Sequence, residues 1–181
     1  MRKIIKALYN PFIQFYFSSK LKSFSSKIES KEVLVLDIDN TIADTWKHLD
    51  QFKKNRKDFF LNLPLLEGTV NHLKENYSHL PIVFISNRNI VDFDVTKQWL
   101  NDNGFNTQKN LLIVTNNPMD KLKYLRFLSN KFAVIYFDDL SYNHENGKIL
   151  FYDKVIEKVN KMNLKYYGYQ VISNLNSNSI Q

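Results

Sequence analysis

Two carboxylates stand one residue apart at the end of an apolar run, in the segment VLVLDIDNTIADT (Val33 to Thr45). The apolar residues of this run are typical of a buried β-strand, and Asp37 and Asp39 follow where that strand ends. Crowding carboxylates where a strand leaves the core is costly unless a cation or hydrogen-bond donors compensate. The spacing therefore indicates a cation site, whose other members must come from elsewhere in the chain.

Polar residues follow two further apolar runs in the same way. They are Ser86, Asn87 and Arg88 at the end of the run 82–86, and Asp138 and Asp139 after the run 132–137. In an open α/β sheet, ligands bind beyond the carboxyl ends of the strands. We therefore expect these side chains to meet the first acidic pair at one edge of a sheet.

A basic group comes from the segment TNNPMDKLKYL. Asn117 is a favourable N-cap and Pro118 suits the first helical position, so a helix should begin here. This start puts Lys121 and Lys123 in or near the first turn, where the helix dipole disfavours cations. An anion nearby explains such a lysine, so we take Lys121 as the candidate site cation and Lys123 as the alternative.

Carboxylates at two strand ends make a hard-oxygen site that suits Mg²⁺ better than zinc. Mg²⁺ accepts one or two carboxylates together with a substrate phosphate, and Ser86 and Lys121 would hold the remaining phosphoryl oxygens. Asp37 would then attack phosphorus and form an aspartyl-phosphate. Asp39 would protonate the leaving oxygen and afterwards deprotonate the hydrolytic water.

Strands and helices alternate along the chain, which predicts an α/β fold with a doubly wound (Rossmann-like), mostly parallel sheet and helices on both faces. The expected strands are Val33–Asp37, Ile82–Ser86, Leu111–Thr115, Phe132–Phe137 and Lys148–Tyr152. Apolar residues at helical spacing predict helices near residues 70–77, 91–99, 119–128 and 155–162. The length of 181 residues suits one domain with a sizeable core.

We divide the chain into a basic, aromatic arm at 1–31, a catalytic domain at 32–172 and a polar tail at 173–181. Within the domain, residues 43–66 are expected to form a flap or minimal cap, because little room for a larger insertion exists between Asp37 and Ser86. The chain contains no cysteine, which excludes disulfides and thiolate metal sites and suits the cytoplasm.

The arm holds seven Lys or Arg residues and one acid, and so +6 of the net charge of +7. Charged and polar residues interrupt its apolar stretch, so we do not expect a membrane span, and no cleavage site of a secretory signal is evident. We favour a helix that packs on its own domain or on a second subunit. Peripheral contact with anionic lipid and direct binding of nucleic acid are the alternatives.

The order of these motifs resembles the haloacid dehalogenase-like phosphohydrolases. DIDNT resembles their first motif, VFISN the second, Lys121 the third-motif lysine and VIYFDDLSYN the fourth. The resemblance implies that Asp37, Asp39 (through its backbone carbonyl) and Asp139 bind Mg²⁺. It further implies that Asp138 and Asn143 support the metal site without being its direct ligands.

Three other residues are candidates for substrate binding: Thr41, Asn87 and Arg88. Arg88 either contacts substrate or pairs with an acid of its own sheet. The segments ISNRN and VTKQWLNDNGF are more particularly similar to the branch of class B and class C acid phosphatases and polynucleotide 3′-phosphatases.

The expected function is therefore that of a Mg²⁺-dependent phosphatase acting on a phosphomonoester through an aspartyl-phosphate. A small-molecule substrate is favoured over nucleic acid, because residues 32–181 carry a net charge of only +1. The alternatives are a 3′-phosphatase on nucleic-acid ends and a non-catalytic phosphate-binding or scaffolding protein of the same fold.

Overall fold

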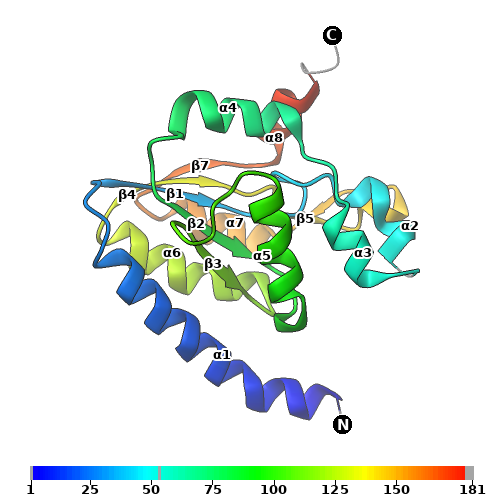
Figure 1. Ribbon diagram of the computed structural model, residues 1–181, viewed down its shortest axis with the longest axis horizontal. Coiled ribbons are helices and arrows are strands. Elements are labelled where there is room, and N and C mark those ends of the chain that lie inside the picture. The colour runs from blue at the N-terminus through cyan, green and yellow to red at the C-terminus, as the bar shows by residue number, and fades with distance from the viewer. Residues whose placement is uncertain (1, 53, 178–181) are drawn as a thin grey trace.

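A five-stranded parallel sheet lies at the centre of the molecule, in the strand order β3-β2-β1-β4-β7 (Figure 1). The structure, a computed structural model, describes residues 2–52 and 54–177, without the side chains of residues 2–10 and 145. The strands are β1 (Glu32–Leu36), β2 (Ile82–Ser86), β3 (Leu111–Val114), β4 (Ala133–Phe137) and β7 (Lys165–Tyr167). Four residues of β1 are fully buried because the strand has neighbours on both sides and helices on both faces.

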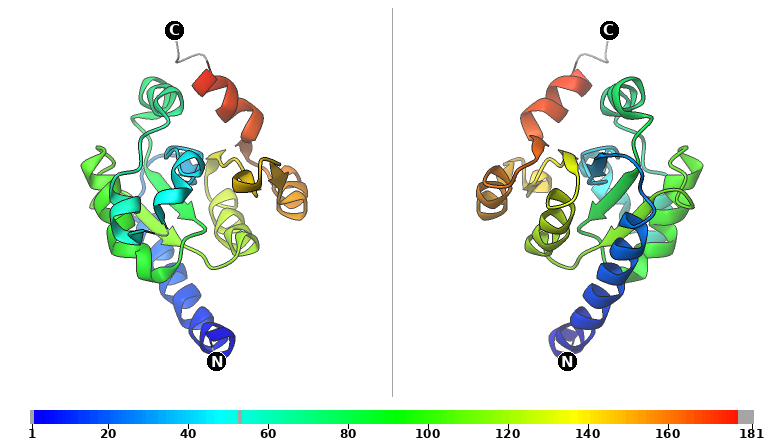
Figure 2. Two further views of the ribbon diagram at one scale, coloured as in Figure 1. Left: turned by 90° about the vertical axis from the view of Figure 1, so that its right-hand side faces the viewer. Right: turned by 90° about the vertical axis from the view of Figure 1, so that its left-hand side faces the viewer.

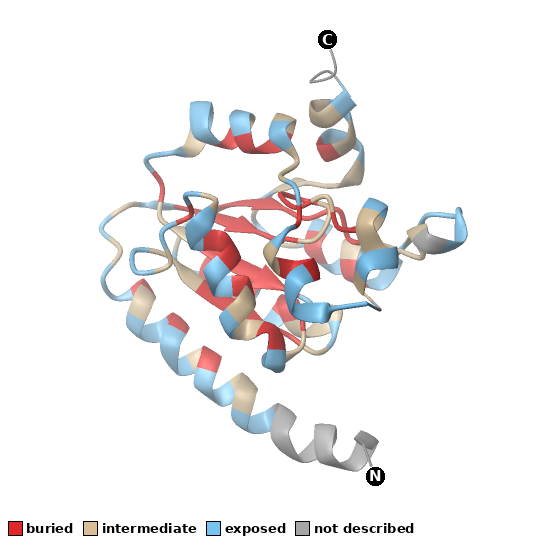
Figure 3. Cartoon of the chain, turned by 45° about the vertical axis from the view of Figure 1, so that its right-hand side comes forward, coloured by how far each residue is buried: buried red, intermediate tan, exposed pale blue. Residues whose placement is uncertain are grey.

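Helices cover both faces of this sheet (Figure 2). One face carries α4 (Glu67–Tyr77), α5 (Phe93–Asp102) and α8 (Tyr169–Ser177), and the other carries α1 (Arg2–Ser25), α6 (Lys121–Ser129) and α7 (Asp153–Asn160). Buried residues line the strands and the inward faces of the helices (Figure 3). The doubly wound, mostly parallel α/β architecture expected from the sequence is thus confirmed.

Four of the expected strands are present to within one residue at each end, but the expected strand Lys148–Tyr152 is wrong. Only Leu150–Phe151 (β6) is extended there, and it pairs antiparallel with β5 (Ser141–Tyr142) outside the main sheet. The fifth main-sheet strand is β7, which pairs with β4 at the edge. β7 escaped prediction because three residues, KYY, are too few to show an alternating or continuous apolar pattern.

The arm forms one helix, α1, whose second half packs on its own domain against β3 and α6. Phe17 and Leu21 of this half are almost fully buried. Among the helices of the described residues, none is long and apolar enough to cross a membrane. At the other end of the chain, α8 continues to Ser177, and the last part of the polar tail, 178–181, lies outside the described residues.

The segment 43–66 folds over the carboxyl end of the sheet as one 3-10 turn, η1 (Trp46–His48), and two short helices, α2 (Leu49–Phe52) and α3 (Arg56–Leu61). Phe59 and Phe60 of α3 are buried. Trp99 of α5 donates a hydrogen bond of 2.9 Å to the carbonyl of Leu63, which follows α3. We call this segment the flap below. Its contacts with α5 hold it above the residues that follow β1, β2 and β4.

Candidate active site

The end of β1 places two carboxylates on the same edge of the sheet. The Asp37 amide donates to the Phe137 carbonyl at 2.9 Å and so continues the pairing of β1 with β4. The chain then turns sharply, because three successive amides, those of residues 41–43, all donate to the Ile38 carbonyl, and Asn40 takes a left-handed conformation with φ 54°. Asparagine tolerates that conformation better than most residues do. The turn keeps Asp39 beside Asp37 at the edge of the sheet.

Lys121, at the first turn of α6, joins two of the acidic strand ends. Its Nζ lies 2.6 Å from Asp138 Oδ2 and 3.0 Å from Asp37 Oδ1, and all three side chains are buried. Burial alone would lower the pKa of Lys121, but the two carboxylates outweigh it and raise that pKa. Lys121 is therefore the charged lysine of the site, while Lys123 is exposed on the same helix.

Asp37, Asp138 and Asp139 form a cluster in which one carboxylate oxygen of each lies within 4.8 Å of the others. Burial, opposed by Lys121 and aided by Asp138 and Asp39, raises the pKa of Asp37 to about 7. Burial and the neighbouring Asp138 likewise raise the pKa of Asp139 well above its ordinary value. These carboxylates repel one another, and the single positive charge of Lys121 does not offset this repulsion.

The cluster fits a divalent cation by two observations. Three carboxylates and Lys121 would carry a net charge of −2 if all were ionised. In addition, Asp37 Oδ1 is buried and has Lys121 Nζ 3.0 Å away as an ion-pair partner, but it accepts no hydrogen bond of regular geometry among the described residues. A buried carboxylate oxygen with this remaining capacity is a suitable ligand for a hard cation such as Mg²⁺.

Asp39 has a different partner from Asp37. Arg88 grips it with two hydrogen bonds, Nε to Oδ2 at 2.8 Å and Nη2 to Oδ1 at 2.7 Å, and Thr45 Oγ1 donates to Oδ1 at 2.7 Å. Burial would raise the pKa of Asp39, but the Arg88 guanidinium and these hydrogen bonds outweigh it and hold that pKa below its usual range. Of the two roles open to Arg88 from the sequence, the structure shows the pairing with an acid.

The guanidinium of Arg88 is itself held in place from two sides. Its Nη1 donates to Thr96 Oγ1 of α5 at 3.1 Å, and its Cζ lies 4.3 Å from the centre of the Phe60 ring in the flap. Arg88 is only 4% exposed. This arginine therefore connects the acid after β1 with the flap above it.

The remaining predicted site residues are placed unequally. Ser86 is buried with its Oγ 3.4 Å from Asp39 Oδ2, and Thr41 Oγ1 accepts a hydrogen bond of 3.3 Å from the Asp139 amide. Asn87 is exposed and lines the same cavity as the acids. Asn143, in contrast, uses its side-chain amide within its own loop, where it donates to the Lys148 carbonyl at 2.7 Å.

Three residues at the site escaped sequence reasoning. The Tyr136 hydroxyl donates to Asp138, and the Ser141 hydroxyl donates to Asp139 and lies 2.6 Å from His144 Nε2. Ser141 thus makes a contact with the acidic pair that Asn143 does not make. Tyr136 stands two residues before Asp138, so strand alternation puts both on one side, and that spacing was a usable signal.

A cavity of about 260 Å³ lies above these groups. Its floor contains Asp37, Asp39, Lys121 and Asp139, and its other wall is the aromatic underside of the flap, formed by Trp46, Phe52, Phe59 and Phe60. Arg56 of the flap donates to Asp92 at the start of α5 through its Nε at 2.6 Å. The aromatic side chains of the flap therefore cover one side of the acidic site, and the ion pair between Arg56 and Asp92 attaches the flap to the start of α5.

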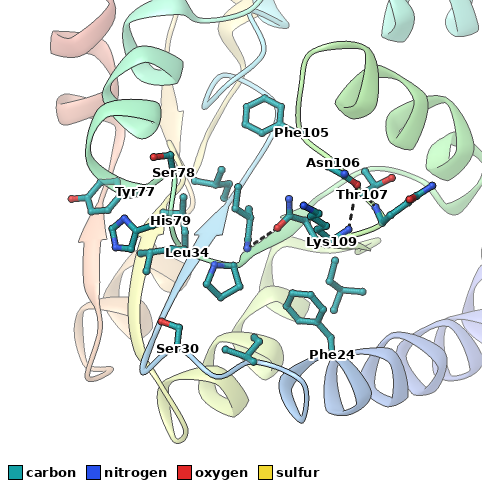
Figure 4. A pocket seen from close by; sticks show the side chains of 18 of the residues that line it. Phe24, Ser30, Leu34, Tyr77, Ser78, His79, Phe105, Asn106, Thr107 and Lys109 are labelled. Atoms are coloured by element: carbon teal, nitrogen blue, oxygen red, sulfur yellow. Dashed lines mark hydrogen bonds between the residues drawn. The ribbon is translucent and has the colours of Figure 1, made fainter.

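A larger cavity, of about 950 Å³, lies at the opposite edge of the sheet (Figure 4). Side chains at the ends of α1 and α4 and in the loop after α5 surround it, among them Phe24, Tyr77 and Phe105. None of the acids described above lines it. Its position at the amino ends of the strands separates it from the acidic cluster and Lys121.

Comparisons with known proteins agree with this architecture. Neither a protein-family model nor a curated protein matches the chain. Among solved structures, the class C acid phosphatase from Bacillus anthracis with tungstate bound is similar, with 18% identity, a TM-score of 0.50 and coverage of 97% of this chain and 90% of that one. A hydrolase from Streptococcus pneumoniae is 13% identical with a TM-score of 0.52, covering 84% of this chain and 99% of that one. The likeness shows the fold, and it agrees with the doubly wound α/β architecture expected from the sequence.

Proposed function

We propose that this protein is a phosphatase that hydrolyses a phosphomonoester with the help of Mg²⁺ and through an aspartyl-phosphate. The observation that carries the proposal is the buried group of Asp37, Lys121, Asp138 and Asp139 at the carboxyl edge of the sheet. Keeping so many charges out of water is costly unless a cation or an anionic ligand compensates them, and such groups cluster at functional sites. The phosphatase fold of a structural neighbour supports the same reading.

Each residue has a role in this proposal. Lys121 and the Ser86 hydroxyl bind oxygens of the phosphoryl group, and an Asp37 oxygen attacks phosphorus while the bond to the leaving oxygen breaks. The leaving oxygen takes a proton from Asp39. Water then attacks the aspartyl-phosphate, gives its proton to Asp39 and releases inorganic phosphate. Asp37, Asp139 and the Asp39 backbone carbonyl would hold Mg²⁺, which supplies charge neutralisation when bound.

The ion pair between Asp39 and Arg88 adds a condition to this sequence. Asp39 stays ionised while it is paired with Arg88, because this ion pair lowers the pKa of Asp39. A bound phosphate offers the guanidinium a second anion in the same cavity, and Asp39 can then take up the proton that it later donates. Binding of substrate and protonation of the acid are thus linked in the proposed mechanism.

A small phosphorylated molecule fits the site better than a nucleic-acid chain. The cavity of about 260 Å³ is covered on one side by the flap, and its volume lies at or below that of ordinary small-molecule pockets. Its aromatic wall of Trp46, Phe52 and Phe59 suits a substrate with an apolar or planar group beside the phosphate.

The test is phosphate release from a panel of nucleotides, sugar phosphates, aryl phosphates and 3′-phosphorylated oligonucleotides, with Mg²⁺ and with EDTA. Wild type is compared with Asp37→Asn and with Asp102→Asn, a matched change at an exposed position at the end of α5. We expect Mg²⁺-dependent release that only Asp37→Asn abolishes. Release that persists in Asp37→Asn contradicts the mechanism, and preference for the oligonucleotides contradicts the assignment of substrate.

A further inference from the structure

Helix α1 has apolar side chains on two opposite faces. Phe17 and Leu21 are 1% exposed and pack into the core of the domain. On the other side, Phe12 is 75% exposed, Phe15 is 76% exposed and Tyr16 is 49% exposed. A helix that only packs on its domain carries polar residues on its solvent side. The three exposed rings therefore need a separate explanation.

The exposed rings form a continuous stripe, because residues 12, 15 and 16 follow the spacing of one helical face. In the sequence, Leu8 and Ile5 continue this spacing toward the N-terminus. We call Phe12, Phe15 and Tyr16 the aromatic stripe. The N-terminal part of α1 extends beyond the rest of the domain (Figures 1 and 2), so the domain does not cover this stripe.

Lysines border the aromatic stripe. Lys20 lies one turn beyond Tyr16, with its Nζ 5.4 Å from the centre of the ring, and Lys22 is exposed on the same helix. The sequence adds Arg2, Lys3 and Lys6 before the stripe, and the whole arm holds only one acid. Two copies joined through this stripe would bring like charges together, which is unfavourable. An anionic partner complements the same charges.

We propose that α1 lies along the surface of a bilayer that contains anionic lipid, with the aromatic stripe in the interface and the lysines at the headgroups. Apolar and aromatic residues on one side of a helix with lysines beside them are the composition of interfacial helices. The buried Phe17 and Leu21 fix α1 to the domain, so binding of the helix would hold the catalytic body next to the surface. This contact is independent of the phosphatase chemistry.

The experiment measures co-sedimentation of the full chain with vesicles of phosphatidylcholine alone or with 30% phosphatidylglycerol. Phe12→Ser/Phe15→Ser removes the rings, and Lys20→Gln/Lys22→Gln removes two charges. The matched controls are Val91→Ser, at a position that is 75% exposed elsewhere, and Lys154→Gln/Lys158→Gln on α7. Substitutions are preferred to deletion of residues 1–22, which would also remove core residues.

We expect the intact chain to bind the anionic vesicles and not the neutral ones, with binding that falls as salt rises. Loss of two lysines should weaken binding about thirtyfold, since each basic residue near an anionic surface contributes on the order of 1 kcal/mol. Loss of both rings should weaken it at least as much, and both controls should bind like wild type.

Three outcomes overturn the proposal. The first is that the intact chain does not bind anionic vesicles. The second is a dimer in lipid-free buffer that Phe12→Ser/Phe15→Ser dissociates, which would make the stripe an interface between copies. The third is binding of a single-stranded oligonucleotide that the same variant abolishes. Unfolding midpoints equal to wild type verify that the variants fold, and phosphate release in solution tests the proposed function separately.

Discussion

Substitution of Asp37 by Asn should stabilise the metal-free protein while it abolishes turnover. Asp37 is buried among other carboxylates, and this surrounding raises its pKa from 3.8 to about 7 although Lys121 opposes the change. At pH 8 the folded protein must hold this carboxylate ionised, at a cost that the pKa difference puts at about 4 kcal/mol. Asparagine has the same shape and carries no charge.

This cost is already net of the attraction between Lys121 and the ionised carboxylate, because Lys121 is one of the groups that set the pKa. We therefore expect Asp37→Asn to raise the free energy of unfolding by up to about 4 kcal/mol at pH 8 in EDTA. The Asp102→Asn control should change it by less than about 0.5 kcal/mol.

The gain should depend on pH with a definite sign. The folded wild type keeps the Asp37 proton up to about pH 7, whereas the unfolded chain releases it near the ordinary pKa of 3.8. The folded state thus binds more protons between these values, and its free energy of unfolding falls as pH rises through that window. The variant lacks this titration, so its advantage over wild type should be smaller at pH 5 than at pH 8.

Urea unfolding measures these differences, with the fluorescence of Trp99, which is fully buried, as the signal. A repeat in Mg²⁺ should stabilise wild type more than Asp37→Asn, because a ligand stabilises the folded state by an amount that rises with the logarithm of its concentration over Kd. The reasoning is refuted if Asp37→Asn is less stable than wild type at pH 8 in EDTA. It is also refuted if the advantage is equal at both pH values.

Other substitutions test other contacts. Arg88→Met should cost about 3 kcal/mol of stability, because it leaves Asp39 in a largely buried site without its cation. In a double-mutant cycle with Asp39→Asn, the losses measured by urea unfolding should be non-additive, and additive losses would refute an interaction between the two side chains. Phe17→Ala should cost about 3 kcal/mol and Phe15→Ala less than about 0.5 kcal/mol, so equal costs would contradict the packing of α1. Asp92→Asn should loosen the flap and raise KM more than it lowers kcat, and an unchanged KM in steady-state kinetics would show that the ion pair does not order the flap.

The central sheet and most of the site were predictable because their signals are strong and local. Apolar runs buried on both faces mark β1, β2, β3 and β4, and the acids that follow two of them must lie at one edge in a parallel sheet. The choice of Lys121 over Lys123 also follows from position, since the first lies at the start of α6 and the second points to solvent.

The contacts that the sequence did not reveal depend on loops. Which side chain after Asp139 would reach the acids depends on how the hairpin of β5 and β6 turns, and the structure brings Ser141 to them where Asn143 was expected. The sequence left two roles open for Arg88, contact with substrate or pairing with an acid, and only the distances show that it pairs with Asp39. The sequence did not show which side of α1 is exposed, because apolar residues occur on both faces of this helix and their spacing does not separate a buried face from a solvent face.

The position of β1 in the middle of the sheet has a consequence for folding. Leu34 pairs with Ile82 and with Ile135, which are 48 and 101 residues further along the chain. Contacts at such separations form slowly, because the entropy cost of closing a long loop is incurred before the strand pairing stabilises the chain. A chain growing from its N-terminus carries Asp37 and Asp39 long before Asp138 and Asp139 are made. The pocket therefore forms only when β4 is inserted beside β1. If Mg²⁺ binds as proposed, its binding would report that insertion during refolding.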